Sequence, residues 1–258
     1  MWTKSEPAWD KLKFLIVNTL SYRGRVFFKG ETLDINPQRT HLIACKTVWD
    51  ELQHHMPEGI TFTEVDMGLH TYPDKLRAEL QKQIDATPLE RDTILLGFGL
   101  CSNAVVGLRA EHQRLVIPCV HDCVPMFLGS RAAFNAQAEA ELGTYYLTKG
   151  FIEGADGDDN SVLSYKRMEK KYGRKKADRI LGYMLKNYTR LALINTGNYG
   201  LEHYRKVAEE AAGRLNLRFE EIPGANDLIL KLVYGPWDED FVIFAPGEMV
   251  TEEPFYQD

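Results

Sequence analysis

Three residues of metal-binding types lie in two short segments of the sequence. Cys101 lies in the glycine-rich segment GFGLCSN, and His121 and Cys123 form a His-x-Cys pair in CVHDC. Imidazole nitrogen and thiolate sulfur bind zinc, and a Cys₂His set with one open position is typical of catalytic zinc, which activates water or a bound thiol. The sequence therefore predicts a zinc site at Cys101, His121 and Cys123.

Further thiols allow a second kind of centre. Cys45 ends the apolar segment HLIAC, so Cys45, Cys101 and Cys123 could instead hold three irons of an iron–sulfur cluster and leave the fourth to substrate. A buried structural thiol is the alternative for Cys45. Cys119 is interpreted as a core filler, because it directly follows an apolar strand. His70 is a candidate for the same site, with a local hydrogen bond as its alternative role.

Apolar segments that alternate with helical patterns must position these side chains. Short buried strands are expected over residues 41–45, 60–68, 93–98, 114–118, 190–197, 217–222 and 240–247. Helices are expected over residues 47–53, 72–86, 130–142, 161–187, 199–215 and 226–232. This alternation predicts an α/β fold with a mostly parallel wound sheet, helices on both faces and a Rossmann-like topology.

Ligands of wound parallel sheets bind at the carboxyl ends of the strands. Cys45, His70, Cys101 and the CVHDC segment each follow a different predicted strand, so their side chains are expected at one edge of the sheet. If the CVHDC segment stayed extended, its two cysteines and its histidine would point to one side.

The domain organisation follows from the same pattern. Residues 1–40 are expected to form an extension or edge element, with a turn at residues 21–24, and residues 41–258 an α/β domain. Several of the expected strands have similar endings. This suggests that the domain consists of two similar halves, residues 41–150 and 188–258, joined by the helical segment 161–187. Residues 143–160 are expected to form a loop with an acidic tip.

Composition and charge exclude several protein classes. The formal net charge of −6 and the pI of about 5.7 argue against a general binder of nucleic acid or of anionic membranes. The N-terminus does not have the pattern of a signal peptide, and no apolar run approaches the roughly 20 residues that span a bilayer. A cytoplasmic protein is therefore expected, in which a reducing environment disfavours disulfides.

Several motifs, in a fixed order, resemble one known family. The segments LIAC, LGFGLCSN, LVIPCVHDC and GTYYLT are similar to those of the Domain of Unknown Function 1638 family, and the resemblance covers about residues 41–250. The recurrent positions of the family are matched here by Cys45, Glu51, His70, Cys101, Asn103, His121, Asp122, Cys123, Gly129, Ser130, Tyr145 and Gly197.

The resemblance also implies a function. Relatives are encoded near corrinoid-dependent methyltransferases and one-carbon enzymes, which implies a metal-dependent enzyme of methyltransferase type or an accessory protein in methyl transfer. The alternatives are an iron–sulfur protein and a non-catalytic binding or chaperone protein for a corrinoid-type cofactor. The expected partners are a small-molecule or cofactor ligand and a corrinoid protein or methyltransferase, and an oligomer is compatible with the sequence.

Roles can be assigned to the matched positions on this basis. We expect Cys45, Cys101, His121 and Cys123 to bind metal, and the catalytic residues to be His70, Asp122 and Tyr145. Residues expected to bind the cofactor are Asn103, Ser130 and Gly197. A helix cap is the alternative role for Asn103 and Ser130, and a plain turn is the alternative for Gly197.

Overall fold

The computed structural model describes residues 19–22, 25–28, 35–155, 163 and 165–256, and the chain forms two compact units, residues 1–34 and 35–258. In the first unit, β1 (Thr19–Tyr22) pairs antiparallel with β2 (Arg25–Phe28). The turn expected at residues 21–24 is therefore wrong at its first two positions, which belong to β1. The apolar segment LKFLIVNTL, residues 12–20, also predicts a strand, and most of it lies outside the described residues.

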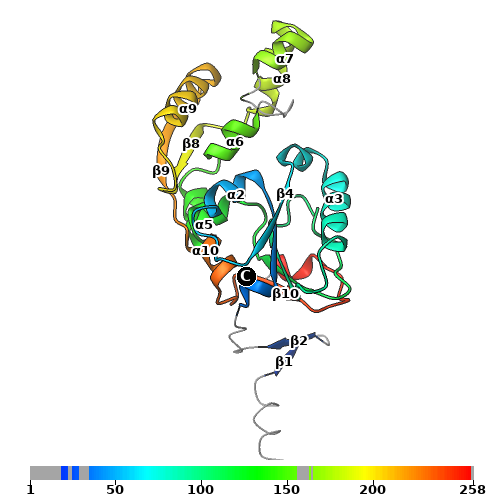
Figure 1. Ribbon diagram of the computed structural model, residues 1–258. Coiled ribbons are helices and arrows are strands. Elements are labelled where there is room, and N and C mark those ends of the chain that lie inside the picture. The colour runs from blue at the N-terminus through cyan, green and yellow to red at the C-terminus, as the bar shows by residue number, and fades with distance from the viewer. Residues whose placement is uncertain (1–18, 23–24, 29–34, 156–162, 164, 257–258) are drawn as a thin grey trace, which may run out of the picture. The chain divides into compact units, whose positions relative to one another are not determined.

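The second unit contains a five-stranded sheet with the strand order β10-β6-β5-β3-β4 (Figure 1). The strands β3 (Thr40–Cys45), β4 (Thr61–Val65), β5 (Thr93–Gly97) and β6 (Arg114–Pro118) run parallel, and β10 (Phe241–Phe244) pairs antiparallel with β6. The apolar runs of β3 and β5 are buried throughout, as expected for central strands that are covered on both faces.

Helices cover this sheet on both sides. The helices α2 (Lys46–Leu52) and α10 (Asp227–Tyr234) lie on one side and α3 (Pro73–Asp85) on the other (Figure 1). The residues Leu76, Leu80 and Ile84 form an apolar stripe at four-residue spacing along α3, and this stripe is buried in the core. Two shorter helices, α4 (Val124–Leu128) and α5 (Arg131–Ala140), follow β6. The predicted α/β fold is therefore confirmed.

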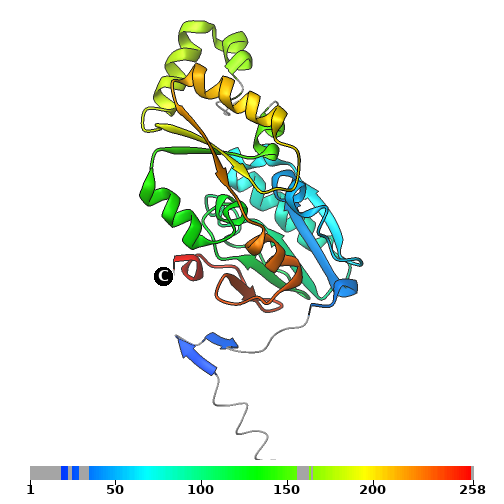
Figure 2. The same cartoon turned by 90° about the vertical axis from the view of Figure 1, so that its left-hand side faces the viewer.

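A second, three-stranded sheet is entirely parallel (Figure 2). It consists of β7 (Thr144–Leu147), β8 (Arg190–Asn195) and β9 (Arg218–Pro223) in that order, and α9 (Glu202–Leu215) packs against β8 and β9. The loop expected over residues 143–160 is wrong at its start, because β7 and α6 (Lys149–Gly154) form there. The aromatic pair in TYYL suits a strand, and the Thr148 hydroxyl caps α6 by accepting from the N–H of Phe151.

The two sheets do not follow the expected halves 41–150 and 188–258. The strand β7 precedes the helical segment but pairs with β8, and β10 returns from the end of the chain to β6. The helical segment is itself two helices, α7 (Tyr165–Tyr172) and α8 (Arg174–Met184), separated at Gly173, whose φ is +75°. This left-handed conformation, which favours glycine, ends the first helix.

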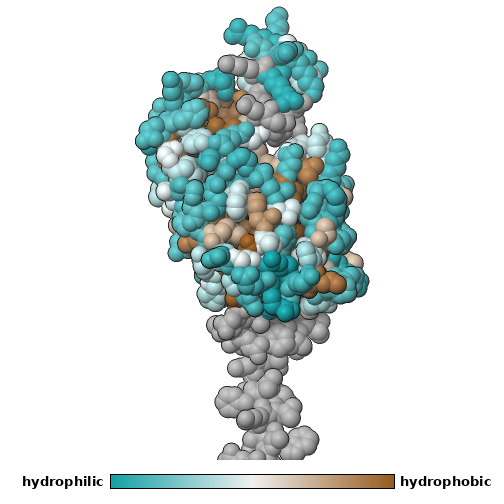
Figure 3. All heavy atoms as spheres, in the orientation of Figure 1, coloured by the Kyte–Doolittle hydropathy of each residue, from teal (hydrophilic) through white to brown (hydrophobic). Residues whose placement is uncertain are grey.

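Short 3₁₀ turns complete the described chain: η1 (Pro37–Arg39), η2 (Met67–Thr71) and η5 (Glu253–Tyr256). The face in Figure 3 is largely hydrophilic, and its apolar residues are confined to separate patches. Within the described residues, every helix is too short or too polar to cross a membrane.

Candidate functional site

Three buried thiols follow three adjacent strands of the five-stranded sheet. Cys45 ends β3, Cys101 lies in the loop after β5, and Cys123 lies in the loop after β6. Cys45 is also the residue before α2, and the backbone N–H groups of Thr47 and Val48 in the first turn of this helix act to lower the pKa of its thiol, against the larger effect of burial.

Close backbone contact holds the loops after β5 and β6 together. The N–H groups of Leu100 and Cys101 donate to the carbonyls of Val120 and His121 at 2.9 and 3.0 Å. Gly99 permits this approach, because a Cβ atom there would lie 2.6 Å from the carbonyl oxygen of Val120. These contacts place Cys101 beside the segment that carries Cys123.

The loop after β5 has a strained backbone at Cys101. Three consecutive residues other than glycine, Cys101, Ser102 and Asn103, have φ values of +47°, +58° and +63°. Each such conformation costs on the order of 1 kcal/mol. Neighbouring side chains support the loop: Arg77 donates to the carbonyl of Asn103 at 2.9 Å, and the Asn103 amide donates to Glu252 at 3.2 Å. Strain of this kind is frequent at functional sites.

The three thiols are buried and affect one another electrostatically. Burial raises the pKa of each thiol, most strongly at Cys101 and Cys123. Cys45 further raises the pKa of both, and Cys101 raises that of Cys123. The nearby carboxyl of Asp122 acts on both in the same direction. Without a cation, all three thiols are therefore protonated at neutral pH.

The chemistry of these donors suits a soft metal. Within the part of the chain that the structure describes, no group of three or more His, Cys, Asp or Glu side chains is arranged to hold a metal ion. The three thiols have the softness that zinc or an iron–sulfur cluster requires, but binding would require them to lose their protons and turn toward one centre. We refer to Cys45, Cys101 and Cys123 as the thiol cluster.

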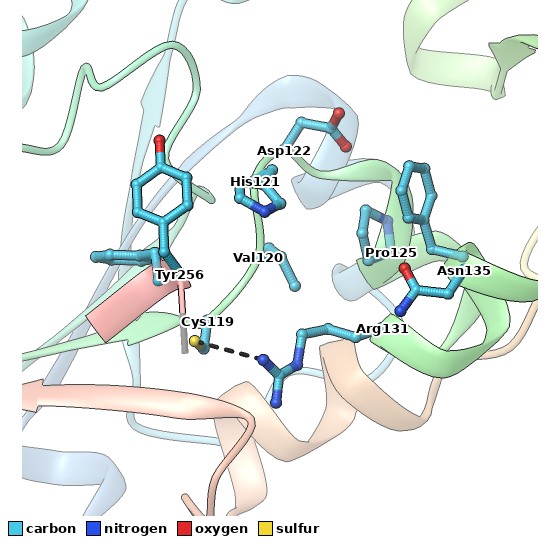
Figure 4. A pocket seen from close by; sticks show the side chains of 10 residues that line it. Cys119, Val120, His121, Asp122, Pro125, Arg131, Asn135 and Tyr256 are labelled. Carbon is cyan, nitrogen blue, oxygen red and sulfur yellow. Dashed lines mark hydrogen bonds between the residues drawn. The ribbon is translucent and has the colours of Figure 1, made fainter. Parts of the chain in front are cut away.

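A pocket of about 220 Å³ lies beside the segment from Cys119 to Asp122 (Figure 4). None of the three thiols of the cluster lines it. Its lining residues are Cys119, Val120, His121, Asp122, Pro125, Arg131, Phe134, Asn135, Phe255 and Tyr256. We call this cavity the outer pocket.

The CVHDC segment does not direct its histidine to the thiol cluster. The segment leaves the strand after Pro118 and bends, so that Cys123 already has helical angles (φ −81°, ψ −9°). His121 is exposed, and its ring lies 5.2 Å from that of Tyr256, in the outer pocket. Cys119 also lines this pocket, where its thiol donates to the carbonyl of Pro254 at 3.3 Å. The CVHDC backbone is therefore not extended throughout, and its two cysteines and its histidine do not point to one side.

Asp122 acts on the thiol cluster, whereas His70 contacts Phe98. The Asp122 carboxylate accepts from the N–H of Val124 at 2.8 Å and so begins α4. Although the residue is exposed as a whole, its carboxyl group lies among protein atoms, and this desolvation raises its pKa. The His70 ring stacks on Phe98, just beyond β5, with a centroid distance of 5.7 Å. Burial lowers the pKa of His70, so the ring is neutral at pH 7.

The other predicted positions have structural contacts. The Ser130 hydroxyl caps α5 by accepting from the N–H of Ala133 at 3.0 Å. Gly197 turns the chain after β8 with a φ of +77°, and its N–H donates to the Asn195 side chain. Tyr145 packs in the core of the second sheet, where its ring lies 5.7 Å from that of Tyr188.

A buried carboxylate links the two sheets. Glu51 of α2 is fully buried and accepts from Thr196, Asn198 and Tyr199 at 2.5, 2.6 and 2.8 Å. All three donors lie in the NTGNY segment after β8. In the sequence, only the family resemblance indicated that Glu51 is important. Its partners lie about 150 residues away, so no local pattern could have identified them.

Comparison with known proteins identifies one family. The family model described as "Protein of unknown function (DUF1638)" matches residues 65–233, which is more than half of the chain. Cys101, His121 and Cys123 lie inside the matched range, whereas Cys45 and Glu51 precede it. A search of the curated proteins and a search of the solved structures each found no significant match.

Proposed function

This chain belongs to the DUF1638 family of proteins of unknown function, and we propose that its thiol cluster binds a soft metal centre that serves corrinoid-dependent or one-carbon methyl transfer. The convergence of Cys45, Cys101 and Cys123 from the ends of three adjacent strands carries this proposal. Ligands of wound parallel sheets bind at this edge.

The raised pKa values of the thiols support the proposal that a metal ion binds them. Cys45 raises the pKa of Cys101 and Cys123, and Cys101 raises that of Cys123, because thiolates without a cation would repel one another. A bound cation reverses this relation, since metal binding releases the thiol protons. The backbone donors of α2 would stabilise the Cys45 thiolate in the loaded state.

Three thiols could bind either of two kinds of metal centre. Zinc with three thiolate ligands and one open position would supply a Lewis acid for a bound thiol or methyl donor. An iron–sulfur cluster is the second candidate, and it is favoured by a set of three thiols to which His121 does not turn. The centre first expected from the sequence, zinc on Cys101, His121 and Cys123, requires the His121 ring to leave Tyr256.

Elemental analysis of anaerobically purified protein tests the metal centre. We expect stoichiometric zinc or iron in the wild type and its loss in Cys45→Ser, Cys101→Ser and Cys123→Ser. The matched control is Cys119→Ser, because Cys119 is also buried but lies outside the thiol cluster. Brown colour with charge-transfer absorption identifies a cluster, and colourless zinc protein identifies the first candidate.

The variant His121→Ala separates the two ligand sets. Retention of metal in this variant, with loss in Cys45→Ser, supports the thiol cluster. Loss in His121→Ala with retention in Cys45→Ser supports the set expected from the sequence. If wild-type protein binds neither zinc nor an iron–sulfur cluster under reconstitution, the proposal is refuted.

The role in methyl transfer needs its own assay. We expect metal-loaded protein to accelerate methyl exchange between methylcobalamin and a small thiol, and Cys101→Ser to lose this activity. A tight, stoichiometric complex with cobalamin in the absence of turnover would instead identify a binding or chaperone protein.

A further inference from the structure

The helices α7 and α8 belong to a strongly basic segment of an acidic chain. Residues 165–188 contain nine lysines and arginines and two acidic residues, which gives a net charge of +7. The whole chain carries −6, so the remaining residues carry −13. In Figures 1 and 2 the two helices extend beyond both sheets, and the same end of the molecule in Figure 3 is hydrophilic. We call residues 165–188 the basic hairpin.

The exposed face of α8 carries two basic side chains and an aromatic ring at helical spacing. Lys175, Arg179 and Tyr183 are exposed and follow one another at four-residue intervals, so they lie on one face of the helix. The ammonium group of Lys186 lies over the Tyr183 ring, 5.0 Å from its centroid. Lys175 and Arg179 form no ion pair with any residue that the structure describes. Their charges are therefore available to a partner.

The apolar faces of both helices are covered within the chain itself. Met168 of α7 and Ala177 and Leu181 of α8 are buried together in one core cluster. The face that a membrane-surface helix would insert into lipid is therefore occupied by the protein. On the outer side, Tyr183 is 73% exposed and Met184 is exposed next to it. Tyrosine and methionine are enriched at protein–protein interfaces.

We propose that the basic hairpin docks on an acidic face of a partner protein, with Lys175 and Arg179 opposite carboxylates of the partner and Tyr183 in contact with its surface. Complementary charges across an interface steer association and fix its register. A protein surface suits the short span of α8, whose 11 residues extend over about 16 Å. A long polyanion such as a nucleic acid would also meet the net charge of −13 on the remaining chain. The basic hairpin contains none of the cluster thiols, so the inference holds whether or not these bind a metal.

Fluorescence anisotropy with the full chain tests the kind of partner. One probe is a labelled helical peptide with glutamate at every fourth position, and the other is a labelled single-stranded RNA of the same net charge. We expect the peptide to bind at least about tenfold more tightly than the RNA, and to bind about tenfold more weakly when salt is raised to about 0.3 M, because salt screens exposed charges.

Three results would overturn the proposal. Peptide binding that is absent or independent of salt would exclude an acidic protein face. RNA that binds as tightly as the peptide would favour a nucleic-acid site. Co-sedimentation of the chain with vesicles of phosphatidylglycerol and phosphatidylcholine would favour a membrane surface.

Two double variants locate the docking surface. Lys175→Glu with Arg179→Glu should weaken peptide binding about tenfold or more. Lys75→Glu with Lys206→Glu is the matched control, because both lysines are exposed outside the basic hairpin and the change in net charge is the same. Tyr183→Ala, which leaves the net charge unchanged, should weaken binding about threefold or more. If the first double variant does not fold, the same two positions changed to glutamine serve instead. Equal binding by the folded hairpin variant and the control would overturn the proposal.

Discussion

Replacement of Glu51 by alanine should destabilise the fold more than almost any other single change at a charged residue. The fully buried carboxylate accepts from Thr196, Asn198 and Tyr199 at 2.5–2.8 Å, and its removal leaves one buried donor, Thr196, and two half-buried donors, Asn198 and Tyr199, without this acceptor. Each unsatisfied donor costs about 1–3 kcal/mol, and water entering the space recovers part of that loss. We therefore expect the free energy of unfolding to fall by about 3–5 kcal/mol.

Urea unfolding at constant m-value measures this loss. Glu64→Ala is the matched control, because Glu64 lies on β4 with an exposed side chain and should change stability by no more than about 0.5 kcal/mol. Glu51→Gln keeps one acceptor oxygen and should lose roughly half as much as Glu51→Ala. A Glu51→Ala protein as stable as the control would refute the reasoning, since the buried network would then contribute nothing.

Three further predictions concern the strained loop, its glycine and a buried histidine. Cys101→Gly should be more stable than Cys101→Ala by about 1 kcal/mol in thermal unfolding, because glycine adopts a φ of +47° without strain. Gly99→Ala should lose about 1–3 kcal/mol and expose Cys101 to faster labelling by Ellman's reagent, because the new Cβ would collide with Val120. Burial lowers the pKa of His41, so the unfolded chain takes up a proton first as pH falls below about 6.5. The wild type should therefore lose stability between pH 7 and 5, and the His41→Asn variant should show a shallower loss in chemical denaturation.

The positions of the thiols were predictable because they depend on strand ends. The apolar runs before Cys45, Cys101 and the CVHDC segment are strong signals, and parallel strands bring their carboxyl ends to one edge. The orientation of His121 was not predictable, because it depends on how the chain bends after Pro118. That bend depends on loop contacts with Gly99 and with the C-terminal residues near Tyr256, which leave no periodic pattern.

The division of the strands between two sheets was also not predictable from the sequence, because it depends on long-range pairing. The strand β7 is short and lies between glycines, so its sequence resembles a loop until β8 pairs with it. The antiparallel return of β10 to β6 is a long-range pairing between distant segments of the chain. The outer pocket was missed as well, because its residues come from the loop after β6, from α5 and from the C-terminal turn η5.

The left-handed turn at Cys101, Ser102 and Asn103 has a consequence for the kinetics of ligand capture. The turn already has its strained conformation in the folded chain, since Arg77 and Glu252 hold it by hydrogen bonds to Asn103. The metal centre that we propose would therefore meet a preorganised backbone at Cys101 and would not need to reshape it. Association should then proceed in a single kinetic phase, and the amides of Leu100 and Cys101 should exchange with deuterium equally slowly before and after loading.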